Sequence, residues 1–139
     1  LTYNKDFFFF LVGLFGNSKA INEAFHITSD EWLTWNQIYG ILAAELQVKP
    51  TIVHIPSDVI ALYNKELGDG LLGDKAHSML FDNSKIKSFV PDFNPQVKFR
   101  DGAKEMIKWY KENTLNEEVD KDINDFMDRI IADYAVESR

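Results

Sequence analysis

The sequence contains no cysteine among its 139 residues, and only three histidines and four prolines. The lack of cysteine excludes disulfides and thiolate metal sites, and it fits a reducing compartment. The 15 basic residues are outnumbered by 22 acidic ones, so the net charge is −7 and the basic surface that nucleic acids require is not expected. We therefore expect a cytoplasmic protein that does not bind nucleic acid.

A long apolar run is also missing. Residues 7–15 are apolar apart from Gly13, whereas a membrane-spanning helix needs about 20 apolar residues. The run lacks the basic start and the clear cleavage site of a signal peptide. Hydrophobic residues make up 45% of the chain and charged residues 27%, which is typical of one soluble domain. The chain begins at Leu1 rather than Met, which we interpret as the mark of a fragment.

Motifs for metal binding and nucleophilic catalysis are missing as well. His26, His54 and His77 are far apart, and no acidic cluster has the spacing of metal ligands. Residues 68–73 have G-x-G-x-x-G spacing, but they follow an expected helix rather than a buried strand, so we interpret them as a flexible loop. No catalytic, cofactor-binding or metal-ligating residue is therefore predicted in this chain.

The strongest local pattern is an expected strand, a tight connection and an amphipathic helix. Residues 24–28 read as a short buried strand, and Thr34 with Gln37 forms a capping-box pattern at the start of a helix that ends at Leu46. Residues 51–55 are β-branched and apolar and predict a second strand. Two strands separated by one helix indicate a βαβ unit, so we expect an α/β fold.

Helical periodicity predicts five more helices, at residues 1–15, 57–63, 84–89, 100–112 and 116–136. Ser57 is expected to cap the second of these, and Asp82 or Asn83 the third. The first is apolar on all sides in its middle, so it is either built against a domain that is absent or buried in a small domain of its own. The glycine-rich residues 67–74 are expected to be the loosest part of the chain.

These segments together resemble the C-terminal part of the extended short-chain dehydrogenase/reductase family, the NAD-dependent epimerases and dehydratases. Residues 24–38 are the most similar, and Asp6 stands where the family opens a helix between its two domains. The other similar segments, in chain order, are Ile55-Pro56-Ser57-Asp58, Gly73-Asp74-Lys75, Phe81-Asp82-Asn83-Ser84-Lys85, Phe99-Arg100-Asp101-Gly102 and Trp109-Tyr110.

The resemblance implies that residues 1–139 are a C-terminal substrate-binding portion, inactive alone, whose N-terminal Rossmann domain is absent from this chain. That domain would bind NAD or NADP, and the family's catalytic Tyr-x-x-x-Lys is missing here. The substrate would be a nucleotide sugar or a related small molecule, and the resemblance also allows a homodimer. It implies substrate contacts from Pro56, Ser57, Asp74, Lys75, His77 and Ser78.

Two alternatives stay open at this point. Lys75 is the one cation of a segment where many members place arginines for a diphosphate, so a different carbonyl or hydroxyl substrate also fits. The loop that carries Lys75 and His77 is either a mobile substrate wall or a solvated loop that contacts nothing. The chain as a whole is alternatively a free-standing binding or interaction domain without catalysis.

Overall fold

The computed structural model describes residues 1–92, 94–113 and 119–137, and all regular structure in these ranges is helical. The chain divides into two compact units. Unit 1 consists of Leu1–Pro50 with Leu80–Asn113, and unit 2 of Thr51–Met79 with the C-terminal helix. The expected α/β fold is wrong, because no strand is present in the described ranges.

The two segments expected to be strands are extended but belong to no sheet. Residues 24–28 and 51–55 have no regular secondary structure. In the first segment, two side chains donate hydrogen bonds to backbone carbonyls. Lys85 Nζ donates to the carbonyl of Ala24 at 2.9 Å, and Asn83 Nδ2 donates to the carbonyl of Thr28 at 2.9 Å. The β-branched residues therefore favour an extended chain here without forming a ladder.

The core of unit 1 lies between α1 (Asn4–Leu14) and α5 (Ser84–Phe89). Phe10 of α1 and Ile86 of α5 are fully buried, and Val90 packs with them. A Cβ built on Gly13 would lie 2.7 Å from Val90 Cγ1, so only glycine allows this close approach of α1. The prediction of helix 84–89 is confirmed, and Asp82 rather than Asn83 supplies the side-chain acceptor for its first N–H, that of Ser84, at 2.8 Å.

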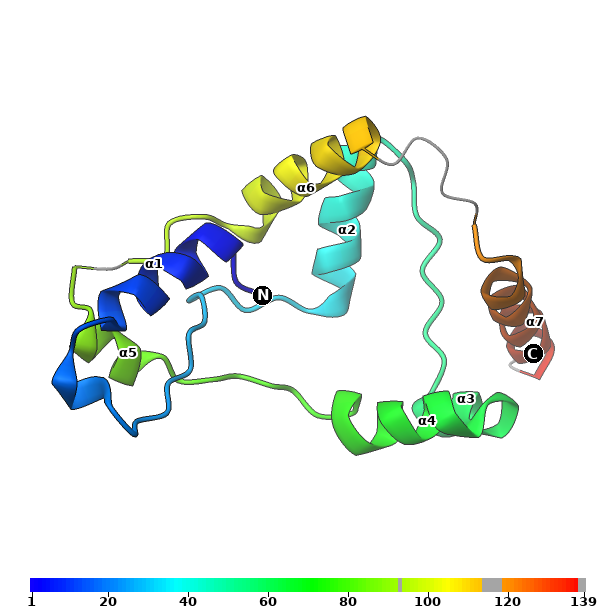
Figure 1. Cartoon of the computed structure of the whole chain (residues 1–139). Coiled ribbons are helices and arrows are strands. Elements are labelled where there is room, and N and C mark those ends of the chain that lie inside the picture. Colours follow the sequence, from blue (N-terminus) through cyan, green and yellow to red (C-terminus); the bar gives the residue numbers. More distant parts are fainter. Residues whose placement is uncertain (93, 114–118, 138–139) are drawn as a thin grey trace. The chain divides into compact units, whose positions relative to one another are not determined.

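A second helix pair in unit 1 consists of α2 (Trp35–Leu46) and α6 (Phe99–Asn113), which contact each other (Figure 1). The predicted capping box is confirmed. Thr34 Oγ1 accepts from the Gln37 N–H at 3.3 Å, and Gln37 Oε1 accepts from the Thr34 N–H at 2.8 Å. The short helix η1 (Ser18–Ala20) follows α1, and the Asn17 side chain caps it by accepting from the Lys19 N–H at 3.1 Å.

Unit 2 consists of α3 (Ser57–Tyr63), α4 (Lys65–Gly70), the π-helical turn η2 (Leu71–Lys75) and α7 (Lys121–Glu137). The helix at 57–63 is confirmed, but Ser57 is its first residue and Pro56 holds the cap position without a side-chain bond. The predicted start of the last helix, at residue 116, lies outside the described residues. Tyr63 of α3 donates a hydrogen bond to Asp133 of α7 at 3.2 Å.

The glycine-rich segment expected to be a loose loop is helical. It forms the end of α4 and the whole of η2. A Cβ built on Gly68 would lie 2.3 Å from Ala61 Cα, so this glycine permits α4 to pack directly on α3. The glycine content predicts flexibility, but Gly68 instead allows two helices to approach closely.

The apolar run of α1 was expected either to be buried in its own domain or to pack against an absent one, and its residues divide between buried and exposed. Phe10 is fully buried in the core of unit 1, while Phe8 and Phe9 are 58% and 57% exposed. Val12 and Phe15 are exposed as well. We call Phe8, Phe9, Val12 and Phe15 the α1 apolar face. In the part of the chain that the structure describes, no helix is both long and apolar enough to cross a membrane.

Candidate functional site

The predicted substrate contacts all lie in unit 2, in two groups. Pro56 and Ser57 begin α3, while Asp74 and Lys75 end η2, which packs against α3. Among the interactions of the described residues, no hydrogen bond or ion pair joins the two groups. The structure thus brings these residues into one unit without building them into one site, and their role stays a prediction.

Lys75, the predicted anion-binding cation, is already paired. Its ammonium contacts the carboxylate of the neighbouring Asp74, and the Lys75 side chain is 58% exposed. His77 and Ser78 follow η2 on the exposed surface. A substrate phosphate or carboxylate would therefore compete with Asp74 for Lys75 in water, where such an ion pair contributes about 0–1 kcal/mol.

In unit 1, residues 23–30 are joined to residues 81–87 by several side-chain contacts. Asn83 Nδ2 donates to the Thr28 carbonyl at 2.9 Å and to Asp30 Oδ1 at 2.7 Å. Lys87 Nζ lies 2.7 Å and 2.8 Å from the two oxygens of the same Asp30 carboxylate. The hydrogen bonds from Lys87 and then from Asn83 lower the pKa of Asp30 below its ordinary value.

Three further contacts join residues 23–30 to residues 81–87. Lys85 Nζ pairs with Glu23 Oε2 at 2.7 Å and lies 4.9 Å from the centre of the Phe25 ring. The rings of His26 and Phe81 meet edge to face with their centres 4.8 Å apart. Each contact crosses from residues 23–30 to residues 81–87. We call this set of contacts the 23–30/81–87 clamp.

A charged turn at the start of α5 lies next to the clamp. The Asp82 carboxylate accepts from the backbone N–H and from the hydroxyl of Ser84, both at 2.8 Å. These two hydrogen bonds lower the pKa of Asp82. Asp82 is therefore ionised at neutral pH and holds the first turn of α5, so its role here is structural.

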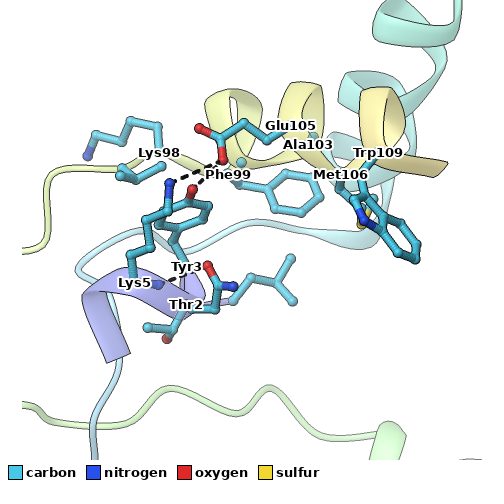
Figure 2. Close-up of a pocket in the computed structure, with 13 residues that line it drawn as sticks. Thr2, Tyr3, Lys5, Lys98, Phe99, Ala103, Glu105, Met106 and Trp109 are labelled. Carbon is cyan, nitrogen blue, oxygen red and sulfur yellow. Dashed lines mark hydrogen bonds and ion pairs between the residues drawn. The ribbon is translucent and has the colours of Figure 1, made fainter. Parts of the chain in front are cut away.

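A pocket of about 550 Å³ lies in unit 1 between the start of α1 and the first turns of α6 (Figure 2). We call it the α1/α6 pocket. Its volume lies within the range of about 300–1,000 Å³ that is usual for small-molecule sites. The apolar part of its wall is formed by Leu1, Val97, Phe99, Ala103, Met106 and Trp109.

The polar part of the α1/α6 pocket is a cluster of three side chains. The Tyr3 hydroxyl donates a short hydrogen bond to Glu105 Oε2, and Lys5 Nζ lies 3.8 Å from the same oxygen (Figure 2). The hydrogen bond with Tyr3, followed by the charge of Glu105, raises the pKa of Lys5. A Cβ built on Gly102 would lie 3.2 Å from Tyr3 Cδ2, so the Tyr3 ring lies directly against α6.

Two carboxylates position the edge of this pocket. Asp6 Oδ2 accepts from the Val97 N–H at 3.3 Å, and Glu31 Oε2 accepts from the N–H of Phe99, the first residue of α6, at 2.7 Å. A carboxylate at the start of a helix is favoured because the helix N-terminus carries a partial positive charge. The segment that leads into α6 is therefore held by α1 and by the residues before α2.

Sequence reasoning missed the α1/α6 pocket. Tyr3 and Glu105 are 102 residues apart, and no local pattern links them. The signal that did exist was the resemblance, which singled out Asp6, the start of α6 and Trp109 without indicating a cavity. In the described ranges, no three His, Asp or Glu side chains are grouped so that they could hold a metal ion. The sequence matches no protein-family model, and no curated protein and no solved structure matches it significantly.

Proposed function

We propose that this chain is the substrate-binding portion of a cytoplasmic NAD(P)-dependent epimerase or dehydratase, acting on a nucleotide sugar or a related small molecule. The observation that carries the proposal is the 23–30/81–87 clamp. Residues 24–38 are the segment that most resembles the family, residues 81–85 are another of the similar segments, and Asn83 joins them through Thr28, 55 residues away. Asn83 and Lys85 of the second segment both donate to backbone carbonyls of the first, so two segments that carry the resemblance are neighbours in the fold.

The residues of this chain do not fit the cofactor. A dinucleotide needs a glycine-rich turn between a strand and a helix. The one G-x-G-x-x-G segment lies in α4 and η2, where Gly70 has helical angles of φ −63° and ψ −39°. We therefore assign NAD or NADP to a Rossmann domain elsewhere in the protein and no cofactor contact to this chain. Its own role is to hold the part of the substrate that does not react.

The α1 apolar face supports a partner domain. Phe8 and Phe9 are more than half exposed on a helix whose next residue, Phe10, is fully buried. Exposed apolar patches of this kind usually mark an interaction surface. The proposed partner is the protein's own Rossmann domain, which the resemblance places against α1, the helix whose first turn contains Asp6.

A second candidate function is a free-standing binding domain without catalysis. The observation that favours it is the absence of any strand in the described ranges, together with the α1/α6 pocket, which is formed by this chain alone. A binding domain would need no second domain to complete its site.

The coding sequence upstream of Leu1 distinguishes the two candidates. We expect it to encode a G-x-x-G-x-x-G segment after a first strand, followed by a Tyr-x-x-x-Lys. If the reading frame that contains this chain holds neither motif, the enzyme proposal is wrong and the binding domain is favoured.

The predicted substrate contacts are tested separately, in the intact enzyme with its substrate. Lys75→Ala should raise KM roughly threefold to tenfold and leave kcat unchanged, because an exposed charge-assisted hydrogen bond is lost. Lys65→Ala is the matched control, since Lys65 is an exposed lysine of the same unit that is also paired with an aspartate, Asp69. If Lys75→Ala and His77→Ala both leave kcat/KM unchanged, these residues do not contact the substrate.

A further inference from the structure

We propose that the α1/α6 pocket binds a small aromatic carboxylate, with its rings against Met106 and Trp109 and its carboxylate beside Lys5. The inference uses residues of unit 1, none of which is a predicted substrate contact. It therefore stands independently of the proposed function.

The volume of the pocket admits a molecule of one or two rings. The cavity of about 550 Å³ exceeds the volume of such a ligand and leaves room for its hydration at the open side. Figure 2 shows the Tyr3, Lys5 and Glu105 side chains meeting at one end and Met106 and Trp109 at the other. The pocket is thus apolar at one end and charged at the other, which matches an amphipathic ligand.

The apolar end offers the contacts that aromatic rings prefer. Trp109 is 61% exposed at the edge of the pocket, and Met106 is also more than half exposed. Aromatic rings gain energy by stacking on indole and by contact with a thioether sulfur. Ala103, a buried residue with a small side chain, also lines the pocket.

The charge at the polar end favours an anion. Two lysines and one glutamate line the pocket, in a chain whose net charge is −7. The Tyr3 hydroxyl already donates to Glu105, and the Lys5 ammonium interacts with Tyr3 and lies 3.8 Å from the same carboxylate oxygen. An ammonium has three N–H donors, so Lys5 can bind a ligand carboxylate while it stays near Glu105. A cationic ligand would be repelled by Lys5 and Lys98.

Calorimetry of the 139-residue chain with 2-naphthoate tests the proposal, beside the neutral 2-naphthamide of the same shape. We expect the carboxylate to bind roughly threefold to tenfold more tightly than the amide, as one exposed charge-assisted hydrogen bond allows. Equal affinities would overturn the assignment of Lys5 as an anion site. No heat of binding for either compound would overturn the pocket as a ligand site.

Two variants with matched controls locate the binding. Trp109→Ala and Lys5→Met should each weaken 2-naphthoate binding at least threefold. The controls are Trp35→Ala, whose indole is equally exposed at 62% but outside the pocket, and Lys19→Met, an exposed lysine of η1. The controls should bind like the wild type. If all four variants bind alike, the ligand lies elsewhere and the proposal fails.

Discussion

Asn83 and Thr28 form a hydrogen bond of 2.9 Å between a side-chain amide and a backbone carbonyl that are 55 residues apart. The same amide donates to Asp30 Oδ1 at 2.7 Å, so one side chain satisfies two acceptors in the extended segment that precedes α2. The sequence predicted a strand at Thr28, whose carbonyl would bond to a neighbouring strand; here it accepts from the Asn83 side chain instead. This hydrogen bond is the central contact of the 23–30/81–87 clamp.

Asn83→Ala should destabilise unit 1 by about 1–2 kcal/mol. The change removes both hydrogen bonds and leaves the partly buried Thr28 carbonyl without its donor. Asn83→Asp should cost at least as much, because its carboxylate would replace the donor and repel Asp30. Urea unfolding followed by circular dichroism measures both. Asn94→Ala, in the same unit, is the control, and an equal shift for Asn83→Ala and Asn94→Ala would contradict the clamp.

Asp30 should make the stability of unit 1 depend on pH in the acid range. Its folded pKa is lowered by the hydrogen bonds from Lys87 and Asn83, so its contribution is present above the ordinary carboxyl pKa of about 4. That contribution is lost as the pH falls through the lowered folded value. Asp30→Asn should therefore cost about 0.5–1 kcal/mol at pH 7, a value reduced by its exposure, and less at pH 2–3.

Thermal unfolding of the wild type and of Asp30→Asn at both pH values measures this difference. Because the carboxylate is half exposed, about 1 M salt should shrink the difference at pH 7 as well. A gap between the two proteins that stays constant from pH 7 to pH 2 would show that the ion pair with Lys87 does not stabilise the fold.

Two neighbouring glycines of unit 2 should respond to alanine in opposite directions. Gly68→Ala places a methyl group 2.3 Å from Ala61 Cα and should cost about 1–3 kcal/mol through overpacking. A Cβ on Gly70 meets no atom within 4 Å, so Gly70→Ala should stabilise the helix by about 0.5–1 kcal/mol. Urea midpoints measure both variants. If both glycines tolerate alanine equally, the segment is the loose loop that its composition indicated.

Two phenylalanines of α1 should also differ in how much their replacement by alanine changes the free energy of unfolding. Phe10→Ala removes a fully buried ring and should cost about 3–5 kcal/mol, a large part of the stability usual for a small domain. Phe8→Ala, on the α1 apolar face, should change the unfolding free energy by about 0.5 kcal/mol or less. Phe8→Asp should reduce self-association of the isolated chain in light scattering. Wild-type chain that stays monomeric over a wide concentration range would contradict an unpaired apolar face.

Local patterns in the sequence predicted the helices well. The Thr34–Gln37 capping box and the helix at 84–89 were confirmed because caps and helical periodicity act within a few residues. The strands at 24–28 and 51–55 were wrong because an apolar, β-branched run specifies an extended chain but not a partner strand. Gly68 was misread because its close contact with Ala61 cannot be seen in composition.

The long-range sites were beyond sequence reasoning for the same reason. Tyr3, Lys5 and Glu105 meet through the packing of α1 near α6, which no spacing rule encodes. The predicted contacts of Lys75 and His77 came from the resemblance, and the structure pairs Lys75 with Asp74.

The cofactor affinity of the intact protein, compared with that of the 139-residue chain, tests the proposed function most directly. Calorimetry should detect NAD or NADP binding to the protein made from the complete reading frame, with a dissociation constant on the order of micromolar. The 139-residue chain should show no binding up to about 1 mM, because its glycine-rich segment is helical and offers no phosphate turn. Micromolar binding by the 139-residue chain alone, or no binding by the intact protein, would contradict the proposal.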